Sequence, residues 1–297
     1  RMLRSFVEQP LIEKGKIEER YDAIEELNQN VITREELREY LNPIYDLERL
    51  VTRVTYQTAS PRDLISFKNS IHMLPPIKNL LLDFKGKKLC SLQESLDPLE
   101  DIYQLIDQAI DEESPLTIRE GGILKDGYND EVDRKKKEKT EGKTWLADLE
   151  AKEREKTGIK NLKIKYNKVF GYYLEVSNSY KNIVPDYYMR KQTLTNAERY
   201  ITPELKEMED TILGAEDRLI QLEYELFREV RDQIAAEVVR IQKTAKSIAN
   251  LDVLASLAVV AEQNNYCRPK LNETGVLDIK DGRHPVVEKM INNDMFI

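Results

Sequence analysis

One segment constrains the fold more than any other: residues 203 to 247 form a helical pattern that no proline interrupts after Pro203. Its apolar residues recur at spacings of three and four, the period of one face of an α-helix. They are Leu205, Met208, Ile212, Ala215, Leu219, Leu222, Leu226, Val230, Ile234, Val238 and Ile241. At 1.5 Å per residue, a helix of about 44 residues would be about 66 Å long. This pattern predicts an elongated protein built around long helices.

The segment before this helix has a different period. Leu162, Ile164 and Tyr166 alternate with Lys163 and Lys165, as the two faces of a half-buried strand require. The same alternation follows a plausible turn at 167–168, and residues 188–194 and 197–201 flank a second turn at Thr195-Asn196. Residues 159–202 are therefore predicted to form a small β-rich module.

The remaining residues have the pattern of helices. Ser60-Pro61-Arg62-Asp63 predicts a helix start. Thr33 to Glu36 has the spacing of a capping box, and Pro43 suits the first turn of the next helix. Residues 127–157 are mostly charged and predict a long helix that is half solvated. We therefore expect a mainly α protein, in which a helical bundle and two long helices carry a small inserted antiparallel β-rich module.

The charge of the chain is unevenly distributed. A net charge of −8 argues against broad adhesion to nucleic acid. Between Ile159 and Thr202, however, eight Lys or Arg stand against three Asp or Glu, a local charge of +5 that leaves −13 for the rest. Positive strands in an acidic protein predict contact with phosphate groups, which position a protein without reading sequence. The candidate DNA-backbone residues are Lys163, Lys165, Lys168, Arg190, Lys191, Gln192, Thr195, Asn196 and Arg199.

Other motifs do not support catalysis. Gly142-Lys143-Thr144 is similar to part of a phosphate-binding loop, but Lys137 stands where that loop needs a glycine. Cys90 and Cys267 form neither a disulfide framework nor a zinc site. No set of Ser, Cys or carboxylate residues suited to catalysis accompanies His72, which favours a core or capping role for it. We predict no catalytic, cofactor or metal site in this chain, no membrane span, and a cytoplasmic location.

Several segments together resemble the bacterial MutS family of DNA mismatch repair proteins. They are Lys163–Asn167, Gly171–Tyr173, Met189–Leu194, Asn196–Ile201, Pro203–Lys206, Asp46–Leu50, Pro61–Leu64 and Gly282–Glu288. The resemblance implies four parts in order along the chain. They are a core with an outgoing lever helix (1–158), a clamp (159–215), a returning lever helix with more core (216–267), and the start of an ATPase domain (268–297).

The resemblance also implies a function. The chain would be the central, DNA-embracing part of a mismatch repair sensor, coupled to an ATPase domain that lies outside it. For the full-length protein it implies a homodimer, ATP and Mg²⁺ as cofactors, a MutL-type repair partner and a place near the bacterial nucleoid. Because the exposed faces are highly charged, we expect this chain alone to be monomeric. The alternative is a structural coiled-coil arm with a β hinge, as in chromosome-organising proteins, which needs no basic strand residues.

Overall fold

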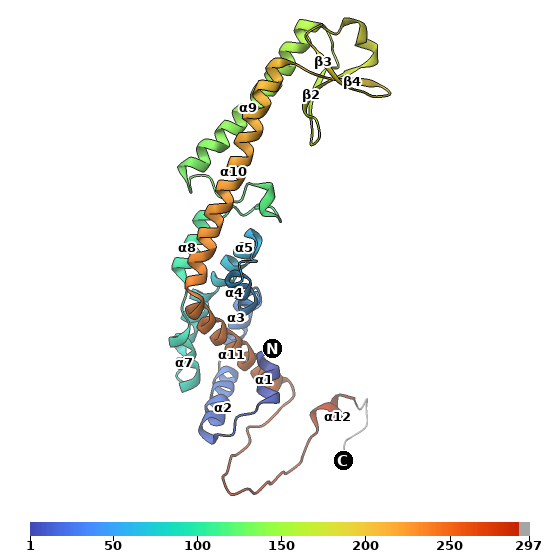
Figure 1. Cartoon of the computed structure of the whole chain (residues 1–297). Coiled ribbons are helices and arrows are strands. Elements are labelled where there is room, and N and C mark those ends of the chain that lie inside the picture. Colours follow the sequence, from blue (N-terminus) through green and yellow to red (C-terminus); the bar gives the residue numbers. More distant parts are fainter. Residues whose placement is uncertain (291–297) are drawn as a thin grey trace.

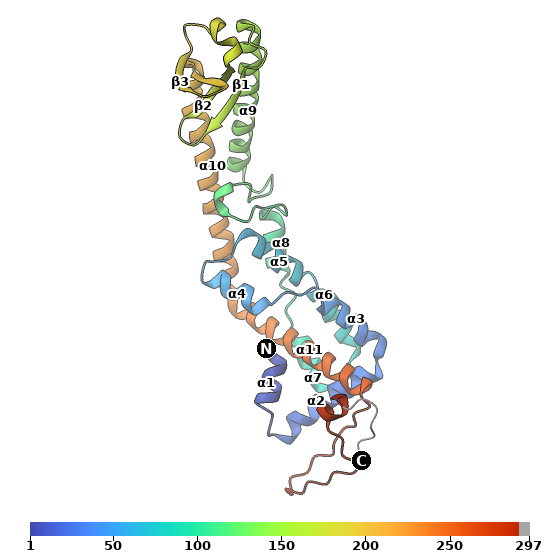
Figure 2. The same cartoon turned by 90° about the vertical axis from the view of Figure 1, so that its right-hand side faces the viewer.

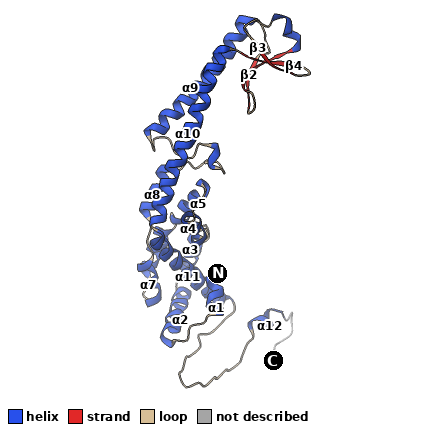
Figure 3. Ribbon diagram, in the orientation of Figure 1, coloured by secondary structure: helices blue, strands red, loops and turns tan. Residues whose placement is uncertain are grey.

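The computed structural model describes residues 1–290 of the chain. A helical bundle lies at one end and a small sheet at the other, and two long helices join them (Figure 1 and Figure 2). Strands occur at this one tip of the described chain, and helices form the rest of its regular structure (Figure 3). The predicted fold class, a mainly α protein with a small antiparallel β insertion, is therefore confirmed.

The bundle is assembled around one apolar helix, α11 (Val238–Gln263). Around it lie α1 (Met2–Glu8), α2 (Lys14–Gln29), α3 (Val31–Leu41), α4 (Leu47–Thr55), α5 (Pro61–Ile71), α6 (Leu74–Leu80), α7 (Lys87–Ser95) and α8 (Glu100–Ala109), with short 3₁₀ turns at Leu81–Asp83 and Ile118–Glu120. α11 packs against α2, α3, α4 and α7. Among residues 1–290 it is the one helix long and apolar enough to cross a membrane, and its central place in the bundle accounts for that composition.

The two long helices, here called the levers, are α9 (Asp130–Thr157) and α10 (Pro203–Ala236). With 28 and 34 residues they are about 42 and 51 Å long. They pack closely at Gly142, where an added Cβ would lie 3.1 Å from Cγ1 of Ile212. Lys139 of α9 also pairs with Glu216 of α10 at 2.6 Å. The Gly142-Lys143-Thr144 triplet thus lies in the interior of a helix, where its glycine permits close packing.

The prediction of one unbroken helix from 203 to 247 is wrong, because Glu237 separates α10 from α11 with φ −93° and ψ 14°. No proline or glycine lies nearby, and the apolar spacing continues through this point. Arg240, in the first turn of α11, bonds to Asp97 at 3.0 Å and to Asp101 and Glu237 at 2.9 Å. These tertiary contacts hold the new helix direction and outweigh the local pattern.

Of the helix starts predicted in the bundle, some are confirmed and others are wrong. The helix start predicted at Ser60 is confirmed, and Ser60 and Asp63 form a capping box there: the Ser60 hydroxyl accepts from the Asp63 amide, and the Asp63 carboxylate accepts from the Ser60 amide. The prediction that Pro43 opens the next helix is wrong. That helix, α4, begins at Leu47, and Asp46 caps it by accepting from the amide of Arg49 at 2.9 Å.

The capping box predicted at Thr33 is also wrong, because α3 begins two residues earlier at Val31. Arg34, within the helix, is buried and donates to Glu262 of α11 at 2.6 Å and to Asn28 at 2.5 Å. A long-range contact that local spacing cannot reveal therefore positions this part of α3.

The β module contains β1 (Lys163–Asn167), β2 (Gly171–Ser177), a 3₁₀ segment η3 (Asn178–Ile183), β3 (Met189–Thr193) and β4 (Ala197–Ile201). The sheet is antiparallel in the order β1-β2-β4-β3, so both predicted hairpins are confirmed. One face of the sheet packs on the outer ends of the levers and forms a second hydrophobic core. That core contains Leu146, Leu149, Ile159, Leu162, Leu174, Val176, Tyr188, Tyr200, Leu205 and Ile212.

Two of the predicted domain boundaries can be compared with the helices and strands of the structure. The boundary between residues 215 and 216 falls inside α10, since the last strand ends at Ile201 and the helix begins at Pro203. After α11 the chain is exposed and mostly irregular until α12 (Pro285–Met290). The predicted start of an ATPase domain covers this segment, and its residues 291–297 lie outside the described residues.

Candidate nucleic-acid interface

The strand register determines which basic side chains share a face of the sheet. Glu175 in the centre of β2 pairs with Lys163 of β1 on one side and with Arg199 of β4 on the other. Arg199 in turn pairs with Gln192 of β3. Because side chains alternate along a strand, Lys165 lies on the same face as Lys163. Four of the nine predicted residues therefore share the outer face, opposite the face that packs on the levers.

Much of the positive charge on this outer face is already compensated. Lys165 bonds to Glu175 at 2.6 Å, and this contact raises the pKa of the Lys165 ammonium. Arg199 lies 3.7 Å from the same carboxylate, donates to Gln192 at 2.8 Å, and stacks 4.4 Å from the ring centre of Tyr173. Its side chain is only 18% exposed. Arg199 therefore ties the strands together, and charge reversal there would disturb the sheet itself.

A second ion-pair group surrounds Glu198, which is buried on the opposite face. Lys181 lies 2.8 Å and Arg190 3.7 Å from its carboxylate, which also accepts from the Tyr200 hydroxyl. Lys181, followed by Tyr200, lowers the pKa of Glu198. Burial and the bond to Glu198 raise the pKa of Tyr200 to about 12. The Arg190 side chain remains 59% exposed, so it stays accessible to a phosphate.

Three of the predicted lysines are uncompensated. Lys163, Lys168 and Lys191 are exposed and form no ion pair with any of residues 1–290. Lys168 lies in the β1–β2 turn, and Lys191 lies at the irregularity where the β3 register shifts. These lysines can meet a phosphate without losing an internal partner.

The two turns lie at opposite ends of the sheet. Thr195 and Asn196 form the β3–β4 turn, beside Ala197, which pairs with Ser177 at the far end of β2 from Lys168. In Figure 1 the β1–β2 hairpin points back toward the bundle, while the β3–β4 turn points away from the levers. The nine predicted residues are thus spread over two turns, the edge strand β3 and the outer face of the sheet, where Lys165 and Arg199 are compensated and Lys163 is not.

A buried carboxylate that the prediction missed fastens the module to α9. Glu153 accepts hydrogen bonds from the hydroxyls of Tyr187 at 2.9 Å and Tyr188 at 2.7 Å. Burial and the bond to Glu153 raise the pKa of Tyr188 well above its usual range. Glu153 follows Leu146 and Leu149 at helical spacing, so the sequence did carry a signal for its burial.

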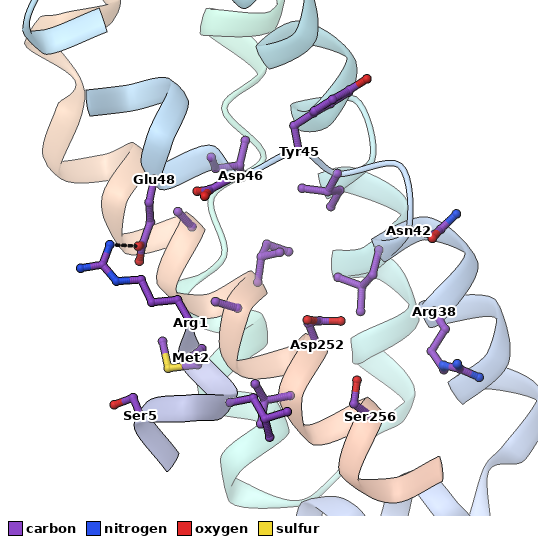
Figure 4. A pocket seen from close by; sticks show the side chains of 18 of the residues that line it. Arg1, Met2, Ser5, Arg38, Asn42, Tyr45, Asp46, Glu48, Asp252 and Ser256 are labelled. Carbon is purple, nitrogen blue, oxygen red and sulfur yellow. Dashed lines mark hydrogen bonds and ion pairs between the residues drawn. The ribbon is translucent and has the colours of Figure 1, made fainter. Parts of the chain in front are cut away.

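A hollow lies elsewhere, in the bundle between α1, α3, α4 and α11 (Figure 4). It measures about 910 Å³, and Arg1 reaches across its rim to Glu48 at 3.3 Å. Glu35, Asp46 and Asp252 also line it, and this acidic lining opposes a phosphate backbone. Within residues 1–290 no group of three or more His, Cys, Asp or Glu is placed to hold a metal ion.

His72 has a structural role. It caps the C-terminal end of α5, and its ring stacks on Tyr103 with 5.3 Å between centroids. The His72 side chain is exposed, so of the two predicted roles its position agrees with the one at a helix end and not with the one in the core.

Together these features define an all-helical body whose paired-helix arm ends in a basic, antiparallel β insertion. The family described as MutS domain III matches residues 1–258. The chain is 65% identical to the DNA mismatch repair protein MutS of Lachnoclostridium phytofermentans, 55% to that of Caldanaerobacter subterraneus subsp. tengcongensis and 52% to that of Acetivibrio thermocellus, each over 100% of this chain. It covers 32%, 34% and 34% of those proteins, about one third of their length. The chain belongs to the MutS family of DNA mismatch repair proteins.

Proposed function

We propose that this chain is the central DNA-embracing part of a mismatch repair sensor, and that its β module holds the duplex backbone without reading sequence. The observation that carries the proposal is the concentration of positive charge at the tip of a long arm. Residues 159–202 have a local charge of +5 in a chain of net charge −8. Lys163, Lys168 and Lys191 lie there without internal partners among residues 1–290.

The chemistry of the edge strand supports contact with phosphates. Arg190 and Lys191 are exposed on β3, and Thr195 and Asn196 follow in the adjoining turn. Charged, hydroxyl and amide groups of these types are common donors to phosphate and sugar oxygens. A strand with mixed short and long donors suits a backbone better than base edges, so we expect matched and mismatched duplexes to bind alike.

The levers support a role in transmitting movement. Val132 of α9 and Leu219, Phe227 and Val230 of α10 are buried in the bundle core. A change in the bundle would therefore tilt the levers as stiff rods and move the module at their outer ends. We propose that this is how the module is coupled to an ATPase domain elsewhere in the complete protein.

The cofactors and partners of the complete protein are part of the same proposal. The amides of Gly142 and Lys143 lie within a helix, so this triplet is not a cradle for phosphate. ATP and Mg²⁺ would bind outside this chain. We propose that the complete protein is a homodimer that acts with a MutL-type partner, and that this chain alone is monomeric.

A charge-reversal pair tests the DNA-binding proposal. Lys191→Glu removes an exposed cation of the module, whereas Lys243→Glu makes the same change in net charge on the bundle helix α11. Fluorescence anisotropy with a labelled duplex should show weaker binding for Lys191→Glu alone. Its slope of log K against log salt should be less negative by about 1. Equal losses in both variants, or a loss in neither, would contradict the assignment of the module.

A further inference from the structure

The β1–β2 turn displays apolar side chains where a polar turn would be expected. Val169 is 81% exposed and Phe170 40% exposed, directly after Lys168. Exposed turns are usually built from Gly, Pro, Asn, Asp and Ser. Single exposed apolar residues are common, but two adjacent ones on a tight turn beside an uncompensated lysine form a specific surface. We call Lys168, Val169 and Phe170 the apolar turn.

The apolar turn is held in a fixed conformation. The Asn167 side chain accepts from the amide of Val169 at 2.8 Å, and Gly171 has a φ of +74°. The Glu209 carboxylate of α10 accepts from the amide of Tyr172 at 3.1 Å. It also fills the space beside Gly171, where a Cβ would lie 2.1 Å from Oε1. The turn is therefore anchored to a lever and presents its side chains without a large ordering cost on binding.

The position of the apolar turn complements the β3–β4 turn. Between them lies β2, whose seven residues span about 20 Å or a little more. The grooves of B-DNA are about 12 and 6 Å wide. One module could therefore touch the duplex on both sides of a groove, with one turn at each end of the sheet.

We propose that the apolar turn is a second DNA contact, in which Val169 and Phe170 pack against the sugars and base edges of a groove while Lys168 pairs with an adjoining phosphate. The inference rests on the proposed function of the module. Apolar side chains at such positions are a known way to hold a duplex from the minor-groove side. Two side chains are far too small an area for a stable contact between two proteins, which needs about 800 Å² per partner.

Salt dependence separates the two kinds of contact within the turn. An apolar contact releases no counterions, whereas a lysine on a phosphate does. Loss of Val169 or Phe170 should therefore lower the affinity by a similar factor at every salt concentration. Loss of Lys168 should lower the affinity and also make the slope of log K against log salt less negative by about 0.9.

The experiment compares variants of the whole chain by fluorescence anisotropy over a salt series. Val169→Ser with Phe170→Ser should weaken binding about tenfold at every salt concentration, from the loss of buried apolar area. Val169→Ser alone changes the more exposed of the two apolar side chains and should show part of this loss without any effect on folding. Ile183→Ser, which changes a half-exposed apolar residue of the same module, serves as the control and should bind like the unchanged chain.

The outcomes distinguish this inference from the proposed function. If Lys191→Glu weakens binding while both turn variants bind like the unchanged chain, the apolar turn is not a DNA contact and the function of the module stands. If the unchanged chain does not bind DNA, the proposed function fails as well. If the turn variants instead abolish a self-association seen by sedimentation equilibrium, the turn contacts a second copy of the chain and the inference is overturned.

Discussion

Glu153 illustrates how one residue can hold the β module on its lever. A buried carboxylate is costly unless it is paired or hydrogen-bonded, and Glu153 receives two tyrosine hydroxyls. Both hydroxyls come from the segment before β3, so the contact joins that segment to α9. The position of the module on the arm therefore depends on polar contacts as well as on the second hydrophobic core.

Tyr188→Phe should destabilise the module by about 1.5–3 kcal/mol, because it removes a buried hydrogen bond to a charged group. Trp145 is the single tryptophan and packs against the second core, so its fluorescence during urea unfolding reports on this region. Tyr187→Phe is the matched control. Its ring is more exposed and should cost less. If the two substitutions lowered the free energy of unfolding equally, the buried hydroxyl of Tyr188 would contribute no more than that of Tyr187, and the prediction would be wrong.

Glu198 should make the module sensitive to acid. Its pKa in the folded chain lies below the ordinary value of 4.5, chiefly because Lys181 stabilises the carboxylate. The unfolded chain then binds the proton more readily, so the contribution of Glu198 is complete above pH 4.5 and is lost as the pH falls through the folded pKa. The stability difference between the unchanged chain and Glu198→Gln should shrink as the pH is lowered. A difference that stays constant down to acidic pH would contradict this.

The sequence predicted where the basic residues of the module lie better than it predicted which of them have ion-pair partners. Alternation correctly placed Lys163 and Lys165 on one face, because period-two spacing depends only on the strand. The spacing could not show that strand pairing brings Glu175 between Lys165 and Arg199. Arg199, which the charge count predicts as a phosphate contact, also pairs with Glu175 and Gln192 within the sheet. Partners from other strands are fixed by register, which a charge count does not contain.

At the scale of elements, periodicity predicted the existence of the levers and missed the break between α10 and α11. Apolar residues continue at helical spacing through Ile234, Val238 and Ile241, and no helix-breaking residue interrupts them. The break depends on Arg240 and its three carboxylates on α8, the α7–α8 loop and the end of α10. Tertiary contacts of this kind are absent from any local pattern. The helix start predicted at Thr33 is wrong for the same reason, since Arg34 is held by Glu262 of α11. The start predicted at Pro43 is wrong because Asp46, a local cap, begins α4 further along the chain.

Arg240→Gln should loosen this junction with little effect on overall stability. The Arg240 side chain is substantially exposed, so solvent screens its ion pairs and the loss should stay below about 1 kcal/mol. Amide hydrogen exchange should nevertheless become faster around Glu237. Arg218→Gln, on an exposed part of α10, is the control and should leave exchange at the junction unchanged. Unchanged exchange in Arg240→Gln would show that packing alone holds the bend.

At the scale of the whole molecule, two separate hydrophobic cores explain the elongated shape. The bundle core contains the inner ends of the levers, and the second core contains their outer ends and the sheet. Between these cores the levers are held by their own packing at Gly142 and by the Lys139–Glu216 pair. The charge asymmetry follows the same division, since the basic module lies at the opposite end of the levers from the bundle (Figure 1). The excess of positive charge is therefore confined to the module, and the rest of the chain is acidic.

The most direct test of the central claim is the affinity of the chain for matched and mismatched duplexes over a salt series. If the module neutralises three or four phosphates, the slope of log K against log salt should be about −3 to −4. The two duplexes should bind equally, because contacts with phosphates do not distinguish bases. A slope near zero, or a clear preference for the mismatched duplex, would contradict the account of the module as a clamp on the DNA backbone.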